Sequence, residues 1–160
     1  MRSLVALSML AMACGAGAGE PLPAGTVALV ETIRGEGEAR RIAAGTSVEI
    51  AGLSRVYLDS GPRLLIREGS LRITEEGVVE VSGHAFLEVH PGDALEVRVG
   101  DVQLTTRNAG FSIEDGSVYV VSGEVRYTAG EESDTLHAGE RLREGRHEPE
   151  PLWEDWTGGL

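Results

Sequence analysis

The chain has 160 residues and a formal net charge of −12; hydrophobic residues make up 41 % of it and aromatic residues only 4 %. All fourteen basic residues are arginine, and the absence of lysine excludes a P-loop and any chemistry that needs a lysine amine. The length suits one domain with a core of Val, Leu, Ile and Ala, and the acidic balance disfavours nucleic-acid binding.

The N-terminus has the layout of a secretory signal. Met1 and Arg2 form a positive start, and the apolar run from Leu4 to Ala13 is broken only by Ser8. Such a run is shorter than the roughly 20 apolar residues that span a bilayer. We predict that residues 1–13 are a signal peptide and that the protein is exported to the periplasm or the outer membrane.

The only cysteine, Cys14, follows Ala11-Met12-Ala13 at the expected cleavage site. A bacterial lipoprotein signal would make Cys14 the lipidated first residue, although that motif prefers Leu where this chain has Ala11. The alternative is a cut by ordinary signal peptidase, here or near Ala18. In either case residues 14–25 are predicted to be a flexible tether, and the mature domain contains no disulfide.

From Thr26 the sequence alternates with period two, and three hairpins can be placed in register. Their turns are Glu75-Glu76-Gly77, Gly100-Asp101 and Asp115-Gly116. The expected apolar pairings are Leu71 with Val81, Ile73 with Val79, the strand Leu95 to Val99 with Val102 and Leu104, and Phe111 and Ile113 with Val118 and Val120.

Beyond Val120 the inward positions shift by one residue, which predicts a β-bulge around Ser122 and Gly123. Further strands are expected at residues 26–33, 47–50, 55–58 and 64–67. The fold class is therefore all-β, either two packed antiparallel sheets or a β-roll, with about ten or eleven short strands over residues 26–143.

The sequence contains no recognisable catalytic or metal motif. The four histidines, His84, His90, His137 and His147, show neither HxH nor HExxH spacing. The His90-Pro91-Gly92-Asp93 segment is similar to a turn of cupin barrels, but the metal motif of those barrels is missing.

Acidic residues at turns offer a second route to chemistry. Asp101 and Asp115 could act as glycosidase carboxylates or bind calcium, yet their hairpin turns explain them. We expect no enzyme activity, no metal and no cofactor.

Aromatic residues are the candidates for partner contact. Phe86 lies on the His84 and Glu88 side of its strand, opposite Leu87 and Val89. If a second sheet covers that side Phe86 belongs to the core, which is the favoured interpretation, and otherwise it marks a contact patch.

Both tryptophans lie in the acidic tail at residues 144–160. Trp153 and Trp156 either cover an open edge of the domain or form a docking segment.

Several segments resemble the FecR domain family. They are Gly83 to Val89, Leu95 to Val99, Asn108-Ala109-Gly110-Phe111-Ser112-Ile113, Val118 to Val125, and Leu136-His137-Ala138-Gly139-Glu140-Arg141-Leu142. The resemblance covers about residues 26–143. It implies an extracytoplasmic β domain that acts through protein contacts, best known in regulators that relay outer-membrane transport signals to a cytoplasmic sigma factor.

Those regulators carry a cytoplasmic segment and a membrane-spanning helix before the domain, whereas this chain begins with a short signal. We therefore expect a binding or scaffolding domain whose partner is an envelope protein or a cell-wall component, with membrane contact only through a lipid on Cys14. The alternative is a sensory or regulatory partner, acting in trans, in signalling to a sigma factor.

Overall fold

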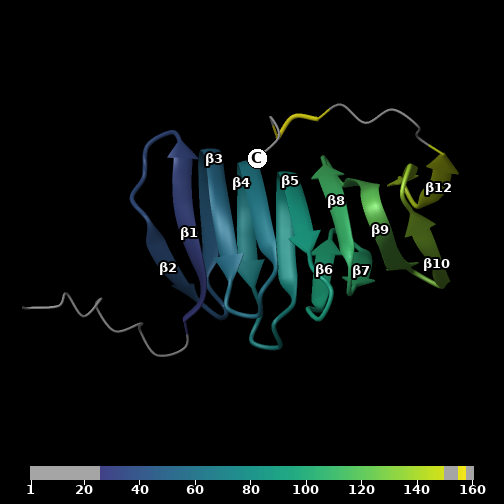
Figure 1. Cartoon of the computed structure of the whole chain (residues 1–160), viewed down its shortest axis with the longest axis horizontal. Coiled ribbons are helices and arrows are strands. Elements are labelled where there is room, and N and C mark those ends of the chain that lie inside the picture. The colour runs from purple at the N-terminus through teal and green to yellow at the C-terminus, as the bar shows by residue number, and fades with distance from the viewer. Residues whose placement is uncertain (1–25, 150–154, 158–160) are drawn as a thin grey trace, which may run out of the picture.

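A computed structural model describes residues 26–149 and 155–157 (Figure 1). Within these ranges the chain forms twelve strands and no helix, which confirms the all-β prediction. The strands are β1 (Thr26–Arg34), β2 (Arg40–Ala43), β3 (Ser47–Leu58), β4 (Arg63–Ile73), β5 (Val79–Val89), β6 (Leu95–Val99), β7 (Val102–Thr106), β8 (Ala109–Glu114), β9 (Ser117–Ala129), β10 (Glu132–His137), β11 (Glu140–Arg143) and β12 (Arg146–Pro149). The predicted lipid site Cys14 and the tail residue Trp153 lie outside the described residues.

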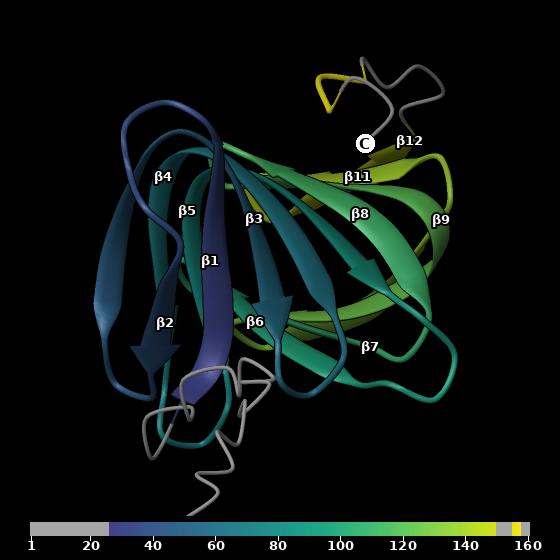
Figure 2. The same cartoon turned by 60° about the vertical axis from the view of Figure 1, so that its left-hand side comes forward.

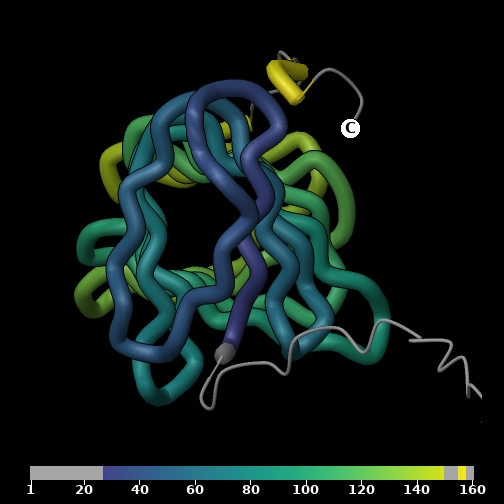
Figure 3. Tube along the Cα trace, turned by 90° about the vertical axis from the view of Figure 1, so that its left-hand side faces the viewer, coloured from purple at the N-terminus to yellow at the C-terminus, as the bar shows by residue number. Residues whose placement is uncertain are grey.

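The strands belong to one hydrogen-bonded sheet that curls into a roll. Its order is β12-β11-β9-β7-β6-β5-β4-β3-β1-β2; β10 pairs with β9, and β8 lies between β5 and β9. Figures 2 and 3 show the chain winding round a common interior, so that the roll, rather than two separate sheets, describes the fold. The strand count exceeds the expected ten or eleven because short edge strands, such as β2 and β12, carry little alternation of their own.

The three hairpin registers expected from the sequence are confirmed. In the β4–β5 pair Leu71 lies opposite Val81, and Arg72 lies opposite Glu80. The guanidinium of Arg72 reaches the Glu80 carboxylate at 3.2 Å on the solvent side. In the other two hairpins Val97 faces Leu104 and Phe111 faces Val120. Alternation sets these registers, because a slip of one residue would turn every apolar side chain outward.

Bulges bend several long strands, so that the two halves of one strand lie in different parts of the curled sheet. In β9 the register skips Val121 between the pairs Gly110–Ser122 and Phe111–Val120, one residue before the predicted bulge. In β4 an extra residue, Glu68, has a φ of 52°. Each extra residue bends its strand. Segments expected as separate short strands therefore join into the long strands β3, β4, β5 and β9.

Gly83 holds the bend of β5 against that of β4. Its φ is +81°, and a Cβ atom there would lie 2.1 Å from the Glu68 carbonyl oxygen. Only a residue without a side chain permits so close an approach at this φ. The bend aims the second half of β5, from His84 to Val89, at β8.

One pairing differs from the antiparallel arrangement expected for every strand. The start of β5 pairs in parallel with β6, through Val79 opposite Val97 and Glu80 opposite Arg98. A parallel pair needs a crossover of about a dozen residues. The second half of β5 and the turn after it supply that crossover. In the sequence, however, β5, this turn and β6 look like an ordinary antiparallel hairpin.

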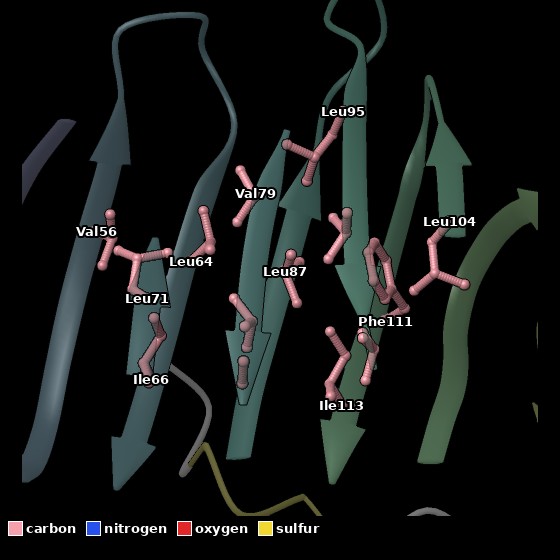
Figure 4. Packing of buried hydrophobic residues seen from close by; sticks show 14 of the residues in the cluster. Val56, Leu64, Ile66, Leu71, Val79, Leu87, Leu95, Leu104, Phe111 and Ile113 are labelled. Carbon is pink, nitrogen blue, oxygen red and sulfur yellow. The ribbon is translucent and has the colours of Figure 1, made fainter. Parts of the chain in front are cut away.

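The core fills the interior of the roll with aliphatic side chains from every wall. Tyr127 and Phe111 are its largest fully buried members, and both are 0 % exposed. Figure 4 shows ten labelled residues of this cluster, on strands β3 to β8. Because the core is complete without a second sheet, the outward faces of these strands are left for other contacts.

Candidate functional site

A stripe of neighbouring side chains crosses the outer face of β4, β5, β8 and β9. Cross-strand pairing aligns Leu65 with Phe86, Phe86 with Ser112, and Ser112 with Tyr119. We call these four residues the outer stripe. Leu65 and Tyr119 are each only 6 % exposed, yet neither belongs to the core cluster. Their burial comes from the outside of the roll.

Alternation along the strands places the stripe outside. Leu64 and Ile66 are core residues, so Leu65 between them points outward. Tyr119 lies between the core residues Val118 and Val120 in the same way. Runs of consecutive apolar residues thus mark strands that are covered on both faces.

Arginine side chains cover both ends of the stripe. Arg55 pairs with Leu65 across β3 and β4, and its Nη1 donates to the Tyr57 hydroxyl at 3.4 Å. At the other end Arg141 lies opposite Tyr119, with its guanidinium carbon 5.6 Å from the ring centroid. Such pairs combine an apolar stem over apolar surface with a cation near a ring face.

Trp156 from the C-terminal tail packs on the middle of the stripe. Its indole N–H donates to Ser112 Oγ at 3.2 Å. The guanidinium carbon of Arg67 lies 5.1 Å from the indole centroid, and the His84 ring meets it edge-on at 6.3 Å. Figures 1 and 3 show residues 155–157 outside the roll, above the strands that carry these side chains.

The Ser112 hydroxyl is oriented to accept a hydrogen bond from the indole N–H. Ser112 is 0 % exposed, and its hydroxyl donates to Glu114 Oε1 at 2.9 Å. That donation leaves the oxygen lone pairs for the indole N–H, so the buried hydroxyl both donates and accepts.

Thr157 is 8 % exposed and donates through its N–H and its hydroxyl to the Asp155 carboxylate. These bonds form a turn that fixes the direction of the chain at Trp156.

A groove continues from Phe86 toward β3. It has a volume of about 280 Å³ and is lined by Arg55, Tyr57, Arg63, Leu64, Leu65, Phe86 and Glu88. Its lining combines apolar and aromatic residues with two arginines and one glutamate. Around the outer stripe four arginines, Arg55, Arg63, Arg67 and Arg141, stand beside the carboxylates of Glu88 and Glu114, on a chain whose net charge is −12.

The structure brings together two of the residues expected to contact a partner. Phe86 and Trp156 lie on the same face of the roll, Phe86 in the stripe and Trp156 on it. The favoured interpretation of Phe86 as a core residue was wrong. Phe86 is half-buried and lies outside the core cluster, because no second sheet covers its face in the described part of the chain.

Sequence reasoning missed Leu65, Arg67 and Ser112. The run Leu64-Leu65-Ile66 was a usable signal, because it breaks the alternation of a strand with one wet face. Arg67 and Ser112 carried no signal, since their roles depend on a tail some 44 residues beyond Ser112 in the chain.

A second, larger groove lies where the two branches of the sheet diverge. It measures about 970 Å³ and is lined mainly by polar residues: Gly77, Ala94, Leu95, Glu96, Thr105, Thr106, Arg107, Asn108, Gly123, Glu124, Arg126 and Thr135. Its charged residues are of both signs, two glutamates and two arginines. That arrangement suits solvent better than the mostly apolar lining of small-molecule sites.

A third cluster joins β10, β11 and β12 through His147. Its Nε2 lies 3.0 Å from Glu140 Oε2, and its Nδ1 lies 3.6 Å from Asp134 Oδ2. The backbone N–H of His137 donates to Glu140 at 2.7 Å and, with the nearby imidazoles, lowers the pKa of that carboxyl. The Thr135 N–H, followed by His147, lowers the pKa of Asp134. In the described residues, no group of three or more His, Cys, Asp or Glu could hold a metal ion.

The other acidic candidates lie where the sequence placed them, at hairpin turns. Asp115 has a φ of 48°, which aspartate tolerates, and its N–H donates to the Gly83 carbonyl. Asp101 is exposed in the turn between β6 and β7. Among residues 26–149 and 155–157 no helix is long and apolar enough to cross a membrane.

The fold is similar to that of solved bacterial structures. Two crystal structures, at 1.65 and 2.50 Å resolution, are described as a "putative anti-sigma factor" from Parabacteroides distasonis. Each matches with a TM-score of 0.57 and 20 % sequence identity, over 66 % of this chain. The match spans 60 % of the length of that chain. At this identity the likeness shows a shared fold.

Sequence comparisons add nothing to that likeness. No protein-family model matches the chain, and no curated protein matches it significantly.

Proposed function

We propose that this chain is a non-enzymatic, FecR-like domain of the bacterial cell envelope that acts by binding a protein through its outer stripe. The observation that carries the proposal is the stripe itself. Leu65 and Tyr119 are almost fully buried outside the core, and Phe86 and Ser112 connect them. A row of one aliphatic and two aromatic side chains with a buried serine hydroxyl among them, on an outward face bounded by arginine, has the composition of a protein contact site.

The second candidate is regulatory: the domain relays a signal in trans to a system that controls a sigma factor. The fold shared with proteins described as anti-sigma factors favours this role. In both candidates the domain is exported and is held at a membrane by a lipid on Cys14. Mass spectrometry of the membrane fraction from wild type and Cys14→Ser tests the anchor, and equal unlipidated N-termini would exclude it.

Site-specific photo-crosslinking tests the binding role. A photoreactive phenylalanine replaces Tyr57, which lines the groove beside Phe86, and in a control replaces the exposed Gln103 of β7. We expect one defined crosslinked species from position 57 and none from position 103. Phe86→Glu, which places a charge in the stripe, should abolish the species, whereas Gln103→Glu should not.

The same variants separate the two candidates. If the domain regulates a sigma factor, Phe86→Glu alters transcription of the genes under that factor. If it only binds, the crosslink disappears and transcription stays unchanged. A crosslink that survives Phe86→Glu would refute the outer stripe as the contact site.

A further inference from the structure

The contacts of Trp156 define a small recognition site rather than a single contact. Ser112 accepts the indole N–H, Arg67 lies over one face of the ring, and His84 approaches its edge. The indole N–H, which is the only polar group of the Trp156 side chain, and the π surface of the ring thus each have a partner, and these partners come from different strands. A site built in this way distinguishes tryptophan from phenylalanine, which has no N–H to donate.

The charges around the site favour carboxylates next to that tryptophan. Three arginines, Arg55, Arg63 and Arg67, lie along one side of the stripe and groove, where they outnumber the carboxylates of Glu88 and Glu114. In the sequence Glu154 and Asp155 directly precede Trp156, the residue that occupies the site. Opposite charges on the surface and the segment give orientation and a faster encounter as well as affinity.

We propose that the outer stripe is a recognition site for an acidic, tryptophan-bearing peptide segment of a partner protein, and that the chain's own C-terminal tail occupies this site in its place. The inference rests on the proposed function and adds to it the chemistry of the partner and a means of control. The tail is the intramolecular competitor, and a partner segment with an indole flanked by carboxylates displaces it.

Tethering determines how strongly the tail competes. A segment joined to its site by a short connection has an effective concentration on the order of millimolar. A free peptide of similar intrinsic affinity must exceed that concentration to bind. Opening the site by removing the Trp156 side chain should therefore expose it to ligands in trans.

Fluorescence anisotropy with a labelled synthetic peptide of residues 149–160 tests the proposal on the full chain. We expect the peptide to bind the Trp156→Ala chain at least about tenfold more tightly than wild type, because the tethered tail no longer competes. Arg67→Glu added to Trp156→Ala should abolish binding. A matched control, Arg98→Glu with Trp156→Ala, changes an arginine that pairs with Glu80 on β5 and should retain it.

Peptide variants test the chemistry of the ligand. Replacing both tryptophans with alanine should abolish binding, and changing Glu154 and Asp155 to their amides should weaken it severalfold. Equal binding to wild type and Trp156→Ala, or no binding to either, overturns the inference. Dimerisation of wild type, lost in Trp156→Ala, also overturns it, because the occupant would then be a second copy of the tail.

The failure of this inference can be told apart from failure of the proposed function. A crosslink at position 57 that depends on Phe86, together with absent peptide binding, leaves the binding role intact and refutes the tryptophan segment. Loss of that crosslink dependence refutes the binding role itself.

Discussion

Gly83→Ala should destabilise the roll far more than the same substitution at Gly77. The two glycines have nearly equal φ values, +81° and +86°. A Cβ at Gly83 would lie 2.1 Å from the Glu68 carbonyl oxygen, whereas a Cβ at Gly77 meets nothing within 4 Å. Both substitutions therefore place alanine at a positive φ and cause the same backbone strain. Only Gly83→Ala also places a Cβ atom where two bent strands approach each other closely.

The magnitudes follow from that difference. Alanine in the left-handed region costs about 1–2 kcal/mol, and the stiffer unfolded chain returns about 0.4–1 kcal/mol, so Gly77→Ala should lose at most about 1.6 kcal/mol. At Gly83 the Glu68 carbonyl must also move, which disturbs the β4–β5 bend and the bond from Asp115 N–H to the Gly83 carbonyl. Two or three weakened hydrogen bonds, at about 1 kcal/mol each, bring the loss to about 3 kcal/mol or more.

Urea unfolding followed by far-ultraviolet circular dichroism measures both values. The m-value should stay unchanged at Gly77, and the midpoint should fall much further for Gly83→Ala. Since Gly83 directly precedes His84, tryptophan emission in the folded Gly83→Ala chain should also shift to the red as Trp156 loosens. Losses that agree within about 0.5 kcal/mol would show that φ alone matters and would refute the close-approach argument.

Three other changes probe the core, the tail contact and the histidine cluster. Phe111→Ala should cost about 3–5 kcal/mol in urea unfolding, because it empties a fully buried ring position. Ser112→Ala removes the acceptor of the Trp156 N–H, so tryptophan emission should shift to the red and acrylamide quenching should rise, with a stability loss of about 1 kcal/mol. Glu140 has a lowered pKa in the folded state, so its contribution is complete above its ordinary value of 4.5 and is lost as pH falls through the lower folded value. The melting temperatures of wild type and Glu140→Gln should therefore differ at pH 7 and converge below pH 4.5; a gap that stays constant would contradict this reasoning.

Local patterning was enough to predict the hairpins. Alternation and turn chemistry lie within a few residues of each other, so pairs such as Leu71 with Val81 and Phe111 with Val120 could be placed from the sequence. The bulge near Ser122 was predictable for the same reason, because the positions of the apolar residues in the sequence shift by one after Val120. The parallel pairing of β5 with β6 was not predictable, because the residues near the turn do not show whether the next strand returns as a hairpin or crosses over.

The candidate site was predictable only in part. Phe86 and Trp156 were singled out as separate aromatics, and the sequence offered no reason to place them on one surface. Ser112 was part of an apolar hairpin and Arg67 one arginine among fourteen. Each acquires its role from a neighbour on another strand or on the tail, a relation that no local pattern records.

The sequence by itself determined the all-β class and the register of three hairpins, because these depend on composition and on contacts between near neighbours in the chain. Tertiary structure alone decided that the strands curl into one roll and that the outer stripe receives Trp156. Bends at residues such as Glu68 and Gly83 set the curl, and they act through close approaches between strands. Whether an outward face is wet or covered depends on what lies over it, and here that cover comes from the far end of the chain.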